Sequence, residues 1–163
     1  MPIYHGGKKL QSLYFGGKKI ASAWYGGKCV YRSGMPVGTV LWSGNASIQP
    51  TSDPATGLPL ASPVVVNLSK DPSLAGNGIK FHFSNVDSID VSQDGTTGLK
   101  TNGTDTVSVP KSLIGQQIAF RVRPTNAWDF GISFTVAQGI SIYATKYYTY
   151  DSVYPILTKV DAY

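Results

Sequence analysis

Apolar and polar side chains alternate residue by residue in several short segments after position 37. In Ile79–Phe83 the apolar residues occupy every second position, and in Ile118–Arg123 both arginines fall on the face opposite the apolar side chains. This period of two is typical of β-strands that bury one face. The candidate strands are Thr39–Ser43, Val64–Leu68, Ile79–Phe83, Ser88–Ser92, Thr106–Val109, Ile118–Val122, Ile132–Val136, Ile140–Tyr147 and Ile156–Asp161.

Turn residues separate these segments, and helix-forming patterns are scarce. Only Lys111–Gln116 could form a helical turn. The chain has no Glu, so all nine acids are Asp, which favours turns over helices. We therefore expect an all-β chain in which residues 37–163 form an antiparallel β-sandwich, jelly-roll-like in layout.

The first 33 residues carry a ten-residue repeat instead. Each copy has two ring-bearing residues before a Gly-Gly pair, then a lysine, and an aliphatic residue two positions after that lysine. The copies are Tyr4–Leu10, Tyr14–Ile20 and Trp24–Val30. A Gly-Gly pair supplies the two positive φ angles of a type I′ hairpin turn. The repeat predicts a β-hairpin meander of about four short strands that turn at the Gly-Gly pairs.

The turns set the register and give one apolar cross-strand pair in each hairpin: Ile3 with Leu10, Leu13 with Ile20, and Ala23 with Val30. Within one strand Ile20 and Ala23 lie on opposite faces. Since a small ribbon with two apolar faces is poorly stable alone, we expect residues 1–33 to dock or oligomerise. The side chains expected to make these contacts are Tyr4, Lys8, Lys9, Tyr14, Phe15, Lys18, Lys19, Trp24, Tyr25 and Lys28.

The net charge of +5 is concentrated in this first module. Residues 1–52 carry six bases and no acid, whereas the rest of the chain has eight bases and nine acids. Such asymmetry favours two functions on one chain. The lysines could also be solvated turn residues that protect sheet edges, or could bind nucleic acid through their alternation with aromatic side chains.

Several features of the sequence bear on the cysteine chemistry and the cellular location of the protein. Cys29 is the only cysteine, so an intramolecular disulfide and a thiolate metal cluster are excluded. No apolar run approaches the ~18 residues of a membrane span, and we expect no membrane association. The N-terminus lacks the layout of a signal peptide, so we expect synthesis in a cytoplasm without classical secretion.

The Y-x-G-G-K-K pattern of residues 3–31 resembles the N-terminal segments of minor tail and related structural proteins from siphophages of Gram-positive hosts. The layout from Gly38–Gly44 to Leu157–Tyr163 is similar to phage tail and receptor-binding sandwiches. This resemblance implies virion attachment through the first module and a sandwich that binds host-surface saccharide or serves only as a structural knob. It also implies a homotrimer.

Trp128 is the strongest candidate for a ligand contact. It lies between two predicted strands and is flanked by Asn126 and Asp129. A sugar can stack its apolar face on an indole ring while amide and carboxylate groups bind its hydroxyls. We therefore predict a saccharide site of Trp128, Asp129, Asn126 and Tyr148, which Tyr147 and Tyr150 could extend. The alternative is that Trp128 caps the sandwich core.

Two other groups of polar residues lead to weaker hypotheses. Arg121 and Arg123 share a strand face and could hold an acidic sugar or phosphate, or could simply be solvated. Asp87, Asp90 and Asp94 precede Gly95, but their spacing does not match a calcium loop, so we predict no metal.

The usual catalytic motifs are missing. There is no Glu, no His pair, no Gly-x-Ser-x-Gly and no phosphate loop, and His5 and His82 lie in separate modules. We expect no enzymatic activity and no cofactor.

Together these observations lead to the hypothesis of a non-enzymatic, tail-associated virion protein whose sandwich projects outward and contacts host cell-wall polysaccharide. Its expected partners are other virion proteins and further copies of itself. Three alternatives stay open: a capsid decoration protein or head fibre, a bacterial carbohydrate-binding module, and a nucleic-acid-binding protein.

Overall fold

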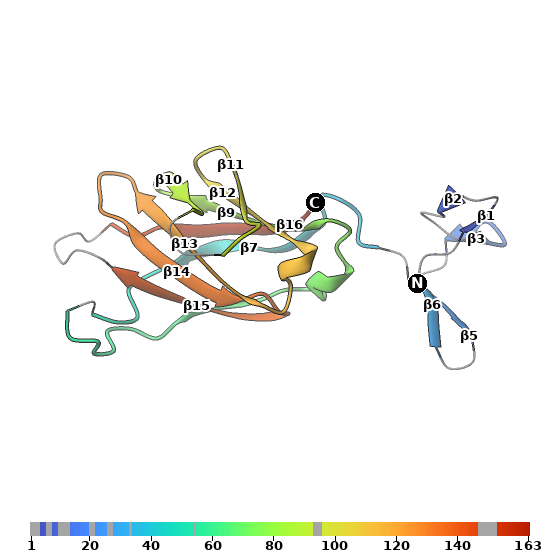
Figure 1. Ribbon diagram of the computed structural model, residues 1–163, viewed down its shortest axis with the longest axis horizontal. Helices are drawn as coiled ribbons and strands as arrows, with labels where there is room; N and C mark the ends of the chain where they lie inside the picture. The colour runs from blue at the N-terminus through green and yellow to red at the C-terminus, as the bar shows by residue number, and fades with distance from the viewer. Residues whose placement is uncertain are drawn as a thin grey trace. The chain divides into compact units, whose positions relative to one another are not determined.

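Figure 1 shows the computed structural model, which describes residues 4–5, 8–9, 14–19, 22–25, 28–32, 34–53, 55–92, 96–146 and 153–163. The chain divides into two compact units, Met1–Met35 and Pro36–Tyr163. The predicted all-β class is confirmed, since the helical segments of the described residues are two short 3₁₀ turns, η1 (Pro72–Leu74) and η2 (Lys111–Leu113).

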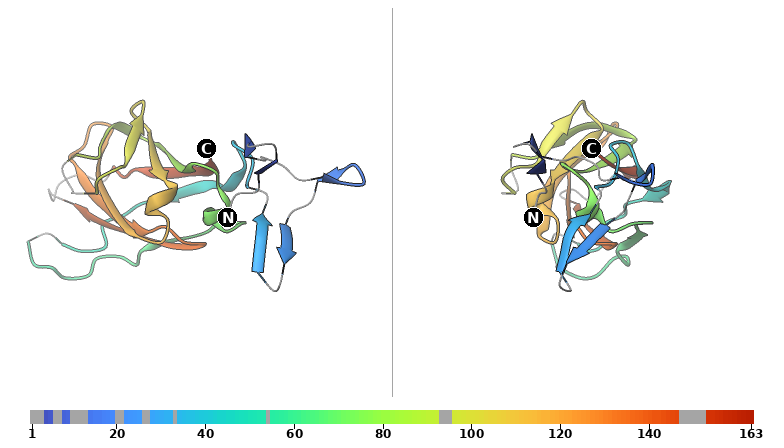
Figure 2. Two further views of the ribbon diagram at one scale, coloured as in Figure 1. Left: turned by 45° about the vertical axis from the view of Figure 1, so that its right-hand side comes forward. Right: turned by 90° about the vertical axis from the view of Figure 1, so that its right-hand side faces the viewer.

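The second unit is the predicted antiparallel β-sandwich. One sheet has the order β10-β13-β14-β15-β8, and the other has the order β11-β12-β9-β16-β7. Figures 1 and 2 show these two layers facing each other. The strands are β7 (Val40–Ser47), β8 (Val64–Asn67), β9 (Gly78–Ser84), β10 (Val86–Asp90), β11 (Lys100–Asn102), β12 (Thr106–Pro110), β13 (Gln117–Pro124), β14 (Phe130–Thr135), β15 (Gly139–Lys146) and β16 (Ile156–Ala162).

The alternation seen in the sequence places the core between the two sheets. In β9, Phe81 and Phe83 are buried, while His82 between them lies on the outer face. In β13, Phe120 and Val122 are fully buried, and Arg123 is exposed. The inward side chains of the two sheets thus form one continuous apolar layer, as expected for a sandwich.

Each of the nine predicted strands is present, with ends shifted by a few residues. The strand β11 was not predicted, because its three residues, Lys100–Asn102, are all exposed and show no apolar alternation. The expected helical turn at Lys111–Gln116 corresponds to η2, and η1 was not predicted.

The first unit consists of short hairpins, whose strands are β1 (Tyr4–His5), β2 (Lys8–Lys9), β3 (Tyr14–Phe15), β4 (Lys18–Lys19), β5 (Ser22–Tyr25) and β6 (Lys28–Arg32). In place of one continuous meander, the described residues pair as three separate two-stranded sheets, β1-β2, β3-β4 and β5-β6. Gly16 and Gly17 have φ angles of 56° and 76°, so the predicted Gly-Gly turn is confirmed in the second hairpin.

The predicted register needs one correction. In the third hairpin Ala23 pairs with Tyr31 rather than with Val30, because a β-bulge between Ala23 and Trp24 shifts the pairing by one residue. A bulge depends on local backbone geometry that the repeat pattern does not encode. The other two predicted apolar pairs, Ile3 with Leu10 and Leu13 with Ile20, lie outside the described residues.

Candidate functional site

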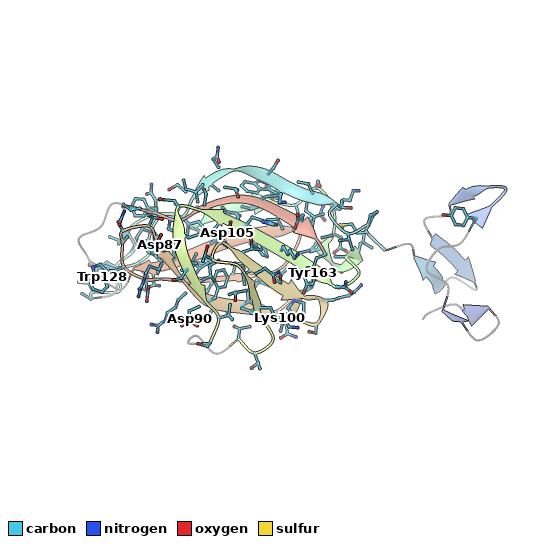
Figure 3. The ribbon with its side chains drawn as sticks, turned by 90° about the horizontal axis from the view of Figure 1, so that it is seen from above. Asp87, Asp90, Lys100, Asp105, Trp128 and Tyr163 are labelled. Carbon is cyan, nitrogen blue, oxygen red and sulfur yellow. The ribbon has the colours of Figure 1, made fainter. Side chains whose placement is uncertain are left out.

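A group of polar and aromatic side chains gathers at one end of the sandwich. It comes from the edge strand β10, from its neighbour β13, and from the loop of residues 125–129 that joins β13 to β14. Figure 3 shows Asp87 and Trp128 toward this end. Since the described part of β10 pairs on one side only, this corner of the sheet is open to solvent.

A bulge in β10 changes which side chains reach the outer face. Ser88 pairs with Arg123 and Asp90 pairs with Arg121, but the register shifts between Val86 and Ser88, so Asp87 is the additional residue. Bulges redirect side chains in this way and are frequent next to binding sites. As a result the consecutive residues Asp87 and Ser88 are both exposed.

The β13–β14 loop is fixed by two backbone contacts. The Ala127 N–H donates to the Pro124 carbonyl oxygen at 3.1 Å, and the Thr125 N–H donates to the Asn85 carbonyl oxygen at 3.1 Å. Asn126 within this turn has a φ of 59°, a conformation that Asn tolerates better than most residues. The turn therefore holds Asn126 and Trp128 in a defined position.

Trp128 lies at the surface rather than in the core. It is 54% exposed, whereas Phe130, two residues later, is fully buried. The alternative that Trp128 caps the sandwich core is therefore wrong. An exposed indole on a constrained turn is a suitable platform for stacking.

A cavity of about 320 Å³ adjoins this ring and is lined by Asp87, Arg123, Asn126, Ala127 and Trp128. This volume is in the lower part of the range of small-ligand sites. The cavity combines one aromatic surface with a carboxylate, a guanidinium and an amide. These are the groups that bind the apolar face and the hydroxyls of a sugar.

Arg123 and Asp129 form an ion pair beside this cavity. The Arg123 Nε donates to Asp129 Oδ1 at 2.8 Å, and Nη2 lies 3.5 Å from Oδ2. The hydrogen bond from Asp129 and the charge of Asp129 raise the pKa of the Arg123 guanidinium above its usual value. Asp129 thus orients Arg123, while Asp87, which we had not predicted as a sugar contact, supplies the carboxylate of the cavity.

A second hollow of about 150 Å³ also adjoins Arg123. It is lined by Ser88, Asp90, Arg121, Arg123 and Asp129. Three acids and two bases line the two hollows taken together. The earlier interpretation of Arg121 and Arg123 as an anion site therefore needs revision, because the carboxylates around them outnumber the guanidinium groups.

The structure brings Trp128, Asn126 and Asp129 to one corner, as the sequence predicted. Tyr148, the fourth predicted site residue, lies outside the described residues, as do Tyr147, Tyr150 and Asp94. Asp87 and Ser88 were missed as site residues, because their positions in the two hollows depend on the pairing of β10 with β13.

The predicted docking residues lie in the strands of the three hairpins. In each hairpin an aromatic residue pairs directly with a lysine: Tyr4 with Lys9, Tyr14 with Lys19, Phe15 with Lys18, and Tyr25 with Lys28. Trp24 pairs with Cys29, and Lys8 pairs with His5. Tyr14 is 63% exposed. The hairpins therefore carry paired aromatic and cationic positions.

A second polar cluster lies on the outer face of the other sheet. His82 Nε2 is 3.0 Å from Asp161 Oδ1, and His82 Nδ1 is 3.3 Å from the Thr106 hydroxyl oxygen. Lys159 Nζ is 2.8 Å from Asp161 Oδ2. A hydroxyl, an imidazole and a carboxylate in series resemble a nucleophilic triad, but Thr106 is only 6% exposed, so a substrate could not reach it. We interpret this cluster as structural.

The described residues show neither a metal site nor a membrane-spanning helix. They contain no group of three His, Cys, Asp or Glu side chains that could hold a metal ion. Their helical turns are also far too short to cross a membrane. Comparisons with protein-family models, curated proteins and solved structures found no match to this chain.

Proposed function

We propose that this chain is a non-enzymatic, tail-associated virion protein of a phage. In this proposal the sandwich binds host cell-surface saccharide at Trp128, and the hairpin unit attaches the protein to other virion components. The observation that carries the proposal is the exposed Trp128 ring, held on a constrained turn beside a cavity lined by Asp87, Arg123 and Asn126.

Two features of the cavity support a saccharide ligand. A sugar ring has one apolar face and several hydroxyls, and the cavity offers one aromatic surface and several polar groups. Asp87 Oδ1 accepts a hydrogen bond from the Thr125 hydroxyl at 2.9 Å, and Asp129 orients Arg123. These polar groups are thus positioned before a ligand arrives, which lowers the entropy lost on binding.

The hairpin unit supports attachment. Three two-stranded sheets are marginal as isolated structures, and association would stabilise them. Their strands carry all six bases of residues 1–52 and no acid, and five of these bases pair with Tyr, Phe or His. Aromatic side chains are common at protein interfaces. Together with the resemblance of residues 3–31 to phage tail proteins, this favours a virion as the partner and a homo-oligomer as the assembly.

A glycan array probed with the full chain tests the saccharide site. Trp128→Ala is compared with Tyr143→Ala, a matched control because Tyr143 is 51% exposed, lies on β15 and lines neither hollow. We expect wild type and Tyr143→Ala to bind the same glycans, and Trp128→Ala to lose about 10-fold or more in affinity. No binding by wild type, or equal binding by Trp128→Ala, would overturn the saccharide site.

Mass measurement of the native protein tests the attachment unit. Because Pro36–Tyr163 is a compact unit of its own, the full chain can be compared with residues 34–163 alone. We expect an oligomer, with a trimer as the resemblance implies, for the full chain and a monomer for the shorter one. If both are monomers, the hairpin unit does not oligomerise, and glycan binding by such a monomer would favour a carbohydrate-binding module instead.

A further inference from the structure

We propose that the site binds a saccharide chain of at least two sugar units, with one unit on Trp128 and the next in the hollow beside Ser88 and Arg121, and that it prefers uncharged or amino sugars to acidic ones. This inference rests on the proposed saccharide function and specifies the ligand class of that site.

The two hollows are adjacent. Arg123 lines both the cavity of about 320 Å³ and the hollow of about 150 Å³. The ion pair with Asp129 uses two of the five N–H donors of the Arg123 guanidinium group. The other three N–H donors are not used by this ion pair. A side chain at the boundary of two hollows can contact two neighbouring units of one ligand.

The bulge in β10 places one side chain in each hollow. In a regular strand Asp87 and Ser88 would point to opposite faces, and only one of them could reach the groove. The register shift between Val86 and Ser88 brings both to the surface, so that Asp87 lines the first hollow and Ser88 lines the second. The same bulge therefore contributes a polar side chain to each of the two hollows.

The two hollows differ in chemistry. The first contains the only aromatic ring among the residues that line either hollow, Trp128, which suits stacking of one sugar. The second is lined entirely by polar residues, namely Ser88, Asp90, Arg121, Arg123 and Asp129. A second sugar there would be held by hydrogen bonds to its hydroxyls and would add affinity mainly when linked to the first.

The charge of the lining argues against acidic sugars. Asp87, Asp90 and Asp129 supply three carboxylates against two guanidinium groups. Arg123 is held by Asp129, and Arg121 pairs across the strands with Asp90. A uronate would add a further carboxylate to a lining that is already net negative, whereas a hydroxyl or an ammonium group would not be repelled.

The test probes a glycan array with the full chain. The array carries glucose, galactose, mannose and N-acetylglucosamine, each as one, two and three linked units. It also carries the corresponding glucuronate and galacturonate series for comparison. We expect at least one uncharged series in which two units bind about 10-fold more tightly than one. Binding of single units equal to that of two units, in every series that binds, would overturn the two-unit site but not the proposed function.

Two variants assign the effect to the second hollow. Ser88→Phe places an aromatic side chain in that hollow, and Thr135→Phe is the matched control because Thr135 is exposed on β14 and lines neither hollow. We expect Ser88→Phe to reduce binding of two units to the level of one unit and to leave single units unchanged, while Thr135→Phe behaves as wild type. An unchanged preference for two units in Ser88→Phe would contradict the inference.

The remaining outcomes are also decisive. Tighter binding of the uronate series than of the uncharged series at low salt would overturn the charge preference. If no series binds to wild type, the proposed function fails together with the inference. If wild type prefers two units to one and Trp128→Ala loses binding, the proposed function and the inference are both supported.

Discussion

The rings of Phe81 and Phe134 pack across the sandwich with their centroids 4.8 Å apart and their planes at 54°. Phe81 belongs to β9 of one sheet and Phe134 to β14 of the other. Phe120 meets Phe134 edge-on at 6.1 Å and Phe83 at 6.0 Å. This aromatic cluster joins the two sheets at the centre of the core.

Phe134→Ala should therefore destabilise the protein strongly. The substitution removes a ring that contacts two others and leaves a cavity, which typically costs about 3–5 kcal/mol. Val65→Ala is the control, since Val65 is 62% exposed and should change the free energy of unfolding by less than about 1 kcal/mol. Urea denaturation followed by fluorescence measures both. Similar values for the two variants would show that the cluster does not hold the sheets together.

The alternation of Ile79–Phe83 was sufficient to predict β9 and its buried face. Such a pattern is local: once a segment is extended, every second side chain must share a face. The same reasoning placed Trp128 in a loop, because turn-forming residues surround it. Local patterns therefore predicted the class of fold, nine of the ten strands of the sandwich, and the residues Trp128, Asn126 and Asp129 of the candidate site.

Relationships between distant segments could not be predicted in this way. His82 and Asp161 are 79 residues apart in the chain, and they meet because β9 and β16 are neighbours in one sheet. Asp87 joins the Trp128 cavity because β10 pairs with β13 and carries a bulge. Strand order and bulges depend on the packing of the whole sandwich, and no single segment encodes them.

Gly78 should be among the least replaceable glycines of the sandwich. Its φ is +148°, and a Cβ there would overlap the Val109 carbonyl oxygen and lie 2.9 Å from the Pro110 Cα. Both contacts are with backbone, which cannot rotate away. We expect Gly78→Ala to lower the free energy of unfolding by about 2–6 kcal/mol, from backbone strain and overpacking together.

Two other glycines separate these causes. Gly115 has a φ of +87° with no heavy atom within 4 Å of a Cβ, so Gly115→Ala should show the strain alone, about 1–2 kcal/mol. Gly76 has neither a strained φ nor a close atom, and Gly76→Ala should change stability by less than about 1 kcal/mol. Thermal unfolding of the three variants should follow this order, and an equal effect of Gly78→Ala and Gly115→Ala would exclude the overlap.

The pair of His82 and Asp161 should make the protein sensitive to acid. Burial raises the pKa of the Asp161 carboxyl, but hydrogen bonds from Lys159 and His82 and their charges outweigh burial, so the pKa in the folded state is lowered. A lowered folded pKa contributes stability at pH values above the unfolded pKa of about 3.9, and this stability is lost as the pH falls through the folded pKa.

We therefore expect Asp161→Asn to be less stable than wild type at pH 7, with the difference shrinking as the pH falls below about 4. Lys159→Gln keeps the carboxyl and removes the positive charge beside it, so its stability should depend less steeply on pH than that of wild type in the same range. Urea midpoints measured between neutral and acid pH give these curves. A difference between Asp161→Asn and wild type that stays constant over the whole range would contradict the lowered pKa.

Asn126 offers a way to separate the shape of the site from its contacts. Its φ of 59° suits Gly as well as Asn, whereas Ala would be strained there. Asn126→Gly should thus keep the turn and change the free energy of unfolding by less than about 1 kcal/mol, while Asn126→Ala should lower it by about 1–2 kcal/mol.

Both Asn126 variants remove the amide that lines the Trp128 cavity. If that amide binds a sugar hydroxyl, both should weaken saccharide binding by a similar factor of about 5–10, because a hydrogen bond contributes roughly 1 kcal/mol. Titration of the two variants with the same oligosaccharide decides the matter. Wild-type affinity in Asn126→Gly with reduced affinity in Asn126→Ala would mean that Asn126 only shapes the turn, and the hydroxyls of the sugar on Trp128 would then have to be bound by the Asp87 and Arg123 side chains of that cavity.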